Sequence, residues 1–399
     1  MSASASIPSP AAEELPRLPL RPRVAVIVPN YNGRHHLATC LESLAAQRAE
    51  AEIALCVADN GSSDGSSAFL EQRFPAVRLV RLPTNQGFAA ACNAAAREMD
   101  VEVLAFLNND MRVEPDWLEH LLVPLRAGAA EASTSRIVDW EGRTIDFAGG
   151  GMNFHGIGIA RGHGELDGPQ HRVAGPSLFA CGGSMAIRRD VFLAAGGFDE
   201  EFFAYYEDVD LGWRLWVLGY RVRYEPASLT YHHLSATSRT FGYERVRLLQ
   251  VRNPLFAIAK NYGERAFQRI LPAALLLTAQ RTFYMARLPV EAFRIELAEG
   301  GGSGRFRELL RKAREGLEDR LAISKVALAD LVALHDFGLH LPRLLRERAA
   351  IQARRRREDR EIFRLFHDPF WAVEPPPEYQ ELQRLLCDEL GIRELFEDS

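Results

Sequence analysis

Short apolar runs alternate with amphipathic segments through the first hundred residues of the chain. The runs are rich in β-branched residues and predict buried strands. The expected strands cover 23–29, 53–58, 77–82 and 101–107. Between the first two, Leu37, Leu41 and Leu44 recur at helical spacing. Strands that alternate with helices in this way predict a parallel, doubly wound α/β sheet.

Polar residues directly follow three of these strands. They are Asn30–Gly33 after the first strand, Asp59–Gly61 after the second and Asn108–Asp110 after the fourth. Because the carboxyl ends of parallel strands lie on one edge of a sheet, these loops are expected to line one ligand-binding crevice. Each loop alone has a plainer explanation, an Asx turn at Asp59 or a helix cap before Trp117. Their convergence on one edge favours a site.

A second cluster of acids lies in 197–211, where aromatic residues are interleaved with carboxylates. Glu207, Asp208 and Asp210 stand at the start of an amphipathic helix, where the helix dipole stabilises negative charge. Capping of that helix by Glu207 or Asp208 is the simpler explanation. A cap does not require two large aromatics and three acids together, so we interpret the cluster as part of a site.

The region between these clusters predicts weaker structure. The glycine-rich stretch 127–175 is expected to include a mobile loop that excludes water from the site. Its weak strands are expected at 135–138 and 144–147, and stronger strands at 179–187 and 220–224. His232 and His233 follow in an extended segment and point to opposite faces, so at most one faces the crevice.

From residue 254 the chain is expected to be helical, with breaks near Pro272 and Pro289. Basic residues beside an apolar face fit a membrane surface, and packing on the sheet domain or a dimer contact fits equally well. A glycine linker is expected at 300–304, and the highly charged segment 305–364 is expected to be helical. Residues 343–360 contain eight arginines and three acids. This excess of positive charge would suit binding to anionic lipid or to an acceptor diphosphate, and its simplest explanation is a solvated helix face.

Composition narrows the function classes. The 399 residues carry a net charge of -5, which gives no basic signature for nucleic acid, so no nucleic-acid partner is expected. The five cysteines contain no CxxC pair, so neither disulfides nor a zinc site is indicated, and a reducing, cytoplasmic location fits. No GxGxxG follows the first strand and no GxxxxGK[ST] occurs, which argues against dinucleotide and P-loop sites.

Neither a signal peptide nor a membrane span is expected. Residues 1–22 lack the apolar core of a signal peptide and are expected to be a disordered tail. The strongly apolar uncharged run 270–280 is far shorter than the ~20 residues that a spanning helix needs. Peripheral contact with the cytoplasmic face of the inner membrane stays open as an alternative.

Four motifs in this order carry a family resemblance: VAVIVPNYNG, VADNGSSDGS, NQGFAAACNAA and FLNND. Together they resemble a family 2 glycosyltransferase with the GT-A fold, and most closely the bacterial rhamnosyltransferase-like branch that builds surface polysaccharides. The resemblance covers about the first 260 residues. It implies a GT-A domain with a mostly parallel sheet over 23–253, followed by a helical region over 254–399.

The resemblance also assigns roles to residues. Asp208 matches the second residue of the family's ED motif, the catalytic base. Asp110 matches the last residue of the DxD motif and is expected to hold Mg²⁺ or Mn²⁺ with His232, His233 being the runner-up. Asn108 replaces the first DxD acid, which leaves one carboxylate for a metal that needs only one or two. Nucleotide binding is expected at Pro29, Asn30, Tyr31, Asn32, Asp59, Asn85, Gly87, Asn93, Asn108 and Asn109. Acceptor or pocket roles are expected at Gly182, Gly183, Glu207, Asp210 and Arg252.

The implied function is inverting, metal-dependent transfer of a sugar from a dTDP- or UDP-sugar to a glycan or a polyprenyl-diphosphate-linked acceptor. Rhamnose is the sugar that the nearest branch suggests. The alternative is a non-catalytic relative that binds nucleotide sugars or glycans, and Asn108 keeps it open. A sugar-phosphate nucleotidyltransferase would need a basic, glycine-rich loop after the first strand, and residues 30–33 are not one.

Overall fold

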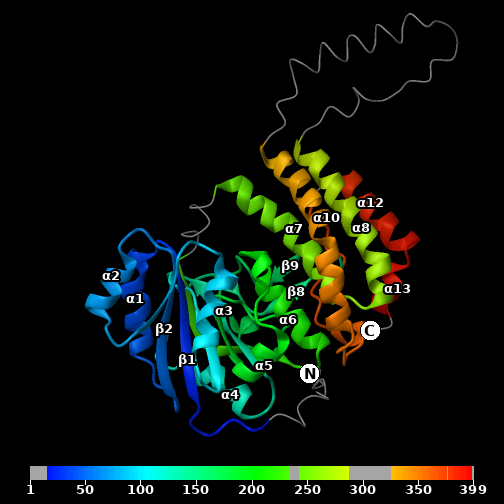
Figure 1. Cartoon of the computed structure of the whole chain (residues 1–399). Helices are drawn as coiled ribbons and strands as arrows, with labels where there is room; N and C mark the ends of the chain where they lie inside the picture. The colour runs from blue at the N-terminus through cyan, green and yellow to red at the C-terminus, as the bar shows by residue number, and fades with distance from the viewer. Residues whose placement is uncertain (1–15, 234–241, 287–324, 375, 398–399) are drawn as a thin grey trace, which may run out of the picture.

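The computed structural model describes residues 16–233, 242–286, 325–374 and 376–397. Most of the expected N-terminal tail and the whole expected glycine linker lie outside these ranges. Figure 1 shows an α/β domain built around a twisted sheet, with a group of C-terminal helices packed on one side of it.

The strands largely match those expected from the apolar runs. They are β1 (Arg23–Asn30), β2 (Glu52–Asn60), β3 (Arg78–Leu82), β4 (Val103–Leu107), β5 (Met111–Val113), β6 (Ala132–Asp139), β7 (Ile145–Phe147), β8 (Gly150–Met152), β9 (Gly158–Ala160), β10 (Gly175–Pro176), β11 (Ser184–Arg188) and β12 (Val222–His232). The strand expected at 179–187 is shorter than predicted, because the chain turns through Gly182 and Gly183 before β11 begins.

The main sheet has the strand order β10-β12-β6-β11-β4-β1-β2-β3. Strands β12, β6, β4, β1, β2 and β3 point in one direction, and β11 is inserted antiparallel between β4 and β6. This confirms the mostly parallel α/β sheet. The carboxyl ends of β1, β2 and β4 therefore lie on one edge, as expected from the polar loops that follow these strands.

Helices fill the connections and form the C-terminal region. They are α1 (Arg34–Ala45), α2 (Ser66–Arg73), α3 (Phe88–Glu98), α4 (Trp117–Arg126), α5 (Arg189–Ala195), α6 (Glu207–Val217), α7 (Tyr243–Asn261), α8 (Glu264–Ala286), α10 (Lys325–Gln352), α11 (Asp359–Phe363), α12 (Pro377–Glu389) and α13 (Ile392–Glu397). The boundary expected at 253/254 falls inside α7, which packs against α6 on one side and α10 on the other. No helix in the described ranges is both long and apolar enough to cross a bilayer.

One expectation for the C-terminal region is wrong. The helix does not break at Pro272, which lies inside α8, and packing of α8 on α7, α10 and α12 offsets the hydrogen bond that proline removes. Pro289 and residues 305–324 lie outside the described ranges. The described part of the charged segment 305–364 is mostly helical, as expected, in α10, which ends at Gln352, and α11, which begins at Asp359.

The arginine run is only partly a solvated face, since Arg346, Arg354, Arg356 and Arg360 are exposed and others are buried. Arg348 and Arg357 are only 6% and 1% exposed. Arg357 donates to the carbonyl oxygen of Tyr220 at 2.6 Å, and Arg355 donates to that of Asn261 at 2.5 Å. Burial lowers the pKa of Arg357 to about 10. These arginines join the C-terminal region to carbonyl groups that follow α6 and end α7.

Candidate active site

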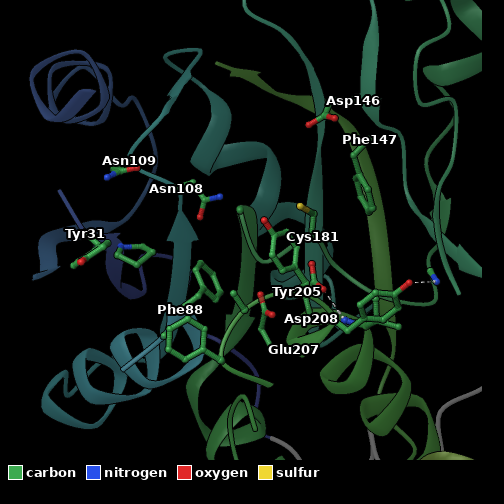
Figure 2. A pocket seen from close by; sticks show the side chains of 18 of the residues that line it. Tyr31, Phe88, Asn108, Asn109, Asp146, Phe147, Cys181, Tyr205, Glu207 and Asp208 are labelled. Atoms are coloured by element: carbon green, nitrogen blue, oxygen red, sulfur yellow. Dashed lines mark hydrogen bonds between the residues drawn. The ribbon is translucent and has the colours of Figure 1, made fainter. Parts of the chain in front are cut away.

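A cavity of about 840 Å³ lies at the edge where β1 and β4 end, and Figure 2 shows its interior. Its wall combines the loops after β1 and β4, the start of α3, the β8–β9 hairpin and the turn that precedes α6. The predicted site residues in that wall are Pro29, Asn30, Tyr31, Asn32, Asn85, Gly87, Asn108, Asn109, Gly183, Glu207 and Asp208. Segments that are distant in the sequence thus meet around one cavity.

Asp59 lies directly behind the cavity wall. It is 4% exposed, and its Oδ1 accepts a hydrogen bond from Asn30 at 3.1 Å while its Oδ2 accepts one from Ser67 at 2.6 Å. Asn109 in turn donates to Asn30 Oδ1 at 2.8 Å. These bonds fix the loops after β1, β2 and β4 relative to one another. The side chain of Asn30 stands in front of Asp59, on the cavity side.

The start of α3 is held by amide side chains. Asn85 Oδ1 accepts from the backbone N–H of Gly87 at 3.0 Å. A Cβ at Gly87 would lie 2.4 Å from the carbonyl oxygen of Phe203, so only glycine permits the close packing of α3 under the turn before α6. Asn93 does not line the cavity, since its amide exchanges hydrogen bonds with the backbone of Phe198 at 2.7 and 3.1 Å.

Asp110 and His232 form a polar corner beside the end of β4. Asp110 is 4% exposed, and its Oδ1 has no hydrogen-bond partner among the described residues. Its Oδ2 lies 3.5 Å from His232 Nε2, and the other ring nitrogen, Nδ1, lies 2.8 Å from Asp146 Oδ2. Burial alone lowers the pKa of His232, but hydrogen bonds and charge from Asp110 and Asp146 raise it to about 9.

This corner fits a hard divalent cation. An unpartnered buried carboxylate oxygen beside a histidine, whose second nitrogen is bound by another carboxylate, is a common metal-ligand arrangement. His233 instead packs its ring against Trp140, with ring centroids 5.0 Å apart. In the described ranges no three His, Cys, Asp or Glu side chains form a metal cage by themselves. A cation here would therefore rely on phosphate and water oxygens for its other ligands.

The turn that leads into α6 is strained. Phe203, Tyr205 and Tyr206 have φ angles of 62°, 66° and 69°, in the left-handed region that non-glycine residues rarely adopt. The turn delivers Glu207 and Asp208 to the cavity, where Figure 2 shows both side chains beside Tyr205. Strain of this kind persists only where surrounding contacts enforce it, and it is concentrated at functional sites.

Asp208 and Glu207 have different surroundings. Asp208 accepts backbone hydrogen bonds from Gly182 at 2.9 Å and Val209 at 2.8 Å. Burial raises its pKa. Glu207 is 7% exposed and its Oε2 has no partner in the described part of the chain. Burial, and then the charge of Asp208, raise the pKa of Glu207 well above its usual value. The pair therefore favours an ionised Asp208 beside a neutral Glu207.

Asp210 and Arg252 do not line the cavity, contrary to the sequence-based expectation. Asp210 is fully buried and accepts from Lys260, Arg214 and Asn261 at 3.0, 2.7 and 2.9 Å. Two residues apart on an α-helix, side chains diverge by about 200°, so Asp208 and Asp210 face opposite ways. Arg252 donates to the carbonyl oxygen of Glu201 and to Asp336 of α10, both at 2.7 Å. Both residues hold the turn and α6 through contacts that lie outside the cavity wall.

Similarity to known proteins decides the family. The model of glycosyl transferase family 2 matches residues 25–194, and that of glycosyl transferase family group 2 matches residues 151–287. The N-acetylglucosaminyl-diphospho-decaprenol L-rhamnosyltransferase of Mycobacterium tuberculosis is 30% identical over 239 residues, which cover 52% of this chain and 75% of that protein. The chain belongs to glycosyltransferase family 2. Within this family it falls in the rhamnosyltransferase-like branch, as its motifs indicated.

Two further matches describe the family relationship. The O-antigen biosynthesis protein RfbC of Myxococcus xanthus is 32% identical over 251 residues, which cover 59% of this chain but only 19% of that longer protein. The solved structure of GalNAc-T7 with UDP, GalNAc and Mn²⁺ has a TM-score of 0.50 at 15% identity, over 76% of this chain and 57% of that one. This likeness agrees with the GT-A fold expected for a family 2 glycosyltransferase.

Sequence reasoning missed several residues around the site of this family 2 glycosyltransferase. Asp146 binds His232 from the middle of a three-residue strand, where no motif marks it. Gln250 reaches the cavity wall from α7, and Trp371 reaches it from the C-terminal helical region. Only the tertiary arrangement brings these positions to the site, so neither spacing nor periodicity could have revealed them.

Proposed function

We propose that this chain is an inverting, metal-dependent glycosyltransferase of surface polysaccharide synthesis. In this proposal it takes a sugar from a dTDP- or UDP-sugar and transfers it to a glycan or polyprenyl-diphosphate-linked acceptor. The observation that carries the proposal is that Asp208 shares one cavity with the loops that end β1 and β4. Rhamnose is the proposed sugar, because the relative from Mycobacterium tuberculosis is named as an L-rhamnosyltransferase that acts on a decaprenyl-diphosphate-linked sugar.

The donor is proposed to lie against the loops after β1 and β4. Asn30, Tyr31 and Asn32 would contact the nucleotide, and Asp59 would position Asn30 from behind. Asp110 Oδ1 and His232 Nε2 would hold Mg²⁺ or Mn²⁺, which when bound neutralises the charge that develops on the departing diphosphate. Asp146 would keep the His232 ring oriented through its 2.8 Å contact with Nδ1.

Asp208 is the proposed base. Its two oxygens are oriented by the backbone N–H groups of Gly182 and Val209, so the carboxylate is held in one position. In an inverting transfer this carboxylate removes the proton of the acceptor hydroxyl while the sugar is attacked from the face opposite the leaving diphosphate. Neutral Glu207 beside it would be able to donate a hydrogen bond to a sugar hydroxyl.

Peripheral contact with the cytoplasmic face of the inner membrane is part of the proposal, because the proposed acceptor is a lipid. Large apolar side chains on α8 and α10 are exposed and support such a contact. They are Leu276, Phe283, Tyr284, Leu328, Leu331, Val332, Leu339 and Leu345. A homodimer contact would use the same surface. Co-flotation with vesicles of anionic lipid, compared with light scattering without lipid, separates the two.

A donor panel tests the proposed function. Purified protein would be incubated with dTDP-rhamnose and a set of UDP-sugars, with Mg²⁺, Mn²⁺ or EDTA, and release of nucleoside diphosphate would be measured. We expect metal-dependent release from one of these donors, faster when an acceptor lipid is present. Tight nucleotide-sugar binding without release under any condition would instead support a non-catalytic binding protein.

A further inference from the structure

The cavity extends past Asp208, away from the proposed nucleotide loops. Figure 2 shows Tyr31 and Phe147 on opposite sides of Asp208. Phe147, Phe179, Ile159, Tyr206 and Trp371 line the cavity as well, and the rings of Phe147 and Phe179 pack with their centroids 5.7 Å apart. The proposed donor uses none of these residues. With the nucleotide against the loops after β1 and β4, these residues are the part of the wall that is left for an acceptor whose hydroxyl reaches Asp208.

Trp371 comes from a part of the chain that neither family model covers, since the two matches end at residues 194 and 287. It is 43% exposed although it lines the cavity. A partly exposed aromatic residue in a cavity wall offers apolar surface that a ligand can cover. The ring is therefore available to a molecule in the cavity.

The segment that carries Trp371 is fixed to the β8–β9 hairpin. The backbone N–H of Phe154 donates to the carbonyl oxygen of Pro369 at 2.8 Å, and Asn153 Nδ2 donates to that of Trp371 at 3.2 Å. A Cβ at Gly151 would lie 2.5 Å from His367 Cβ, so glycine allows the two segments to touch. Trp371 is thus presented by a rigid support, as a preorganised binding surface requires.

The same support continues into the C-terminal helices. Gln383 of α12 donates to the carbonyl oxygen of Phe370 at 2.7 Å. The Phe370 ring packs against those of Phe154 and Phe396, with centroids 6.0 and 5.3 Å apart. The position of Trp371 therefore depends on α12 and α13 as well as on the hairpin.

The chemistry of this wall matches a sugar ring. A pyranose has an apolar face of C–H groups and a rim of hydroxyls. The aromatic rings of Trp371, Phe179 and Tyr206 offer apolar surface, and polar side chains of His163 and Gln250 line the same cavity. A polyprenyl chain alone would favour a wholly apolar groove, so the mixed wall is better suited to the sugar than to the lipid.

We propose that Trp371 is the surface on which the acceptor's sugar ring stacks, so that the C-terminal segment completes the acceptor site. This inference rests on the proposed function. It assigns the C-terminal helical region a role in acceptor selection, in addition to any contact with a membrane. Acceptor selection by this chain would then depend on a segment outside the family-model matches to residues 25–194 and 151–287.

Substitution of Trp371 separates acceptor binding from donor chemistry. Trp371→Ala is expected to raise the KM for N-acetylglucosamine linked by diphosphate to a short isoprenyl chain about tenfold. Acceptor-independent hydrolysis of the sugar nucleotide should stay unchanged, and Trp371→Phe should recover most of the loss. Tyr243→Ala, which removes an aromatic side chain that is 65% exposed on α7, serves as the control and should behave like the native protein.

The outcomes distinguish this inference from the proposed function. The inference would be overturned if Trp371→Ala kept the native acceptor KM, or if it lost donor hydrolysis to the same extent. In either case, turnover by the native protein would leave the proposed function standing. If the native protein releases no nucleoside diphosphate from any donor, the proposed function fails. Calorimetric binding of the same isoprenyl-linked sugar then still tests Trp371, since the alanine variant must bind it more weakly. Thermal unfolding of both variants verifies that they are folded.

Discussion

The Nδ2 of Asn253 lies 2.7 Å from the carbonyl oxygen of Tyr205. The same nitrogen also lies 3.0 Å from the carbonyl oxygens of Phe202 and Ala204. One amide on α7 thus holds the strained turn that presents Glu207 and Asp208. Left-handed conformations of non-glycine residues cost about 1–3 kcal/mol each, so the turn needs a contact of this kind.

Removal of the amide donor should misplace the base. Asn253→Asp keeps the shape of the side chain but replaces the donor with an acceptor that repels three carbonyl groups. We expect kcat to fall about 100-fold, because a displacement of the base by about 1 Å has that effect, while nucleotide affinity stays near the native value. Gln268→Glu, at an exposed amide that donates to Glu264 at 2.6 Å, makes the same kind of change on α8 and should leave kcat unchanged. A native kcat in Asn253→Asp would show that the turn before α6 keeps its conformation without the Asn253 amide.

Asp146 should set metal affinity through His232. Asp146→Asn removes the carboxylate 2.8 Å from Nδ1, so the ring loses its orientation and its most favourable tautomer. The Mn²⁺ concentration for half-maximal nucleoside-diphosphate binding should rise about 10- to 100-fold. Asp100→Asn, at a side chain that is 91% exposed, is the matched control. An unchanged Mn²⁺ midpoint would mean that His232 takes no part in holding the ion.

The pH dependence of turnover should report the buried base. Burial raises the pKa of Asp208 above its ordinary 3.8, and the base works only when ionised. Activity should therefore be full above that raised pKa and fall as pH decreases through it, at a pH higher than for an exposed aspartate. Burial and the charge of Asp208 raise the pKa of Glu207 well above its usual value, so Glu207 is not the group expected to ionise in this limb, and Glu207→Gln should leave the limb in place. A profile of kcat against pH measures both, and an acid limb at or below 3.8 would contradict the assignment.

Lys260 should be a stability determinant rather than a catalytic residue. Its Nζ lies 2.6 Å from Asp199 and 3.0 Å from Asp210, joining α6 to α7, and its side chain is 3% exposed. Lys260→Met leaves buried carboxylates without their cation and should lower the free energy of unfolding by about 3–5 kcal/mol. Urea denaturation measures this change. A loss below about 1 kcal/mol, typical of exposed pairs, would show that the network is not truly buried.

The same network predicts the sign of the pH effect on stability. Burial alone would raise the pKa of Asp210, but the charges of Lys260 and Arg214 lower it below its usual value. A carboxylate with a lowered pKa in the folded state contributes stability above its unfolded pKa and loses it as pH falls through the folded value. The native protein should therefore lose stability steeply on acidification, and Lys260→Met should lose less over the same range.

The first half of the fold was predictable because its signals are local. The apolar runs that became β1 to β4 and the polar residues at their ends lie within a few residues of one another, and sheet geometry then requires them to share an edge. The placement of Asp210 was predictable too, since helical spacing turns it away from Asp208. Interpreting Glu207, Asp208 and Asp210 as one cluster hid the fact that Asp208 and Asp210 face opposite ways.

The rest depends on contacts between distant segments. Asp146 meets His232 only because β6 lies between β7 and β12 in the sheet. Trp371 reaches the cavity only because its segment docks on the β8–β9 hairpin. From the sequence, the arginines after α10 would be expected to lie in solvent. No local feature shows that some of them donate to backbone carbonyl groups near α6 and α7. No periodic pattern encodes such pairings.

The base assignment is the central claim, and Asp208→Asn tests it most directly. Turnover of the preferred sugar nucleotide and calorimetric affinity for its nucleoside diphosphate would be measured on the same preparation. We predict that turnover falls about 1,000-fold or more, since a general base supplies that order of acceleration, while the affinity changes less than about twofold. Near-native turnover by Asp208→Asn would contradict the account.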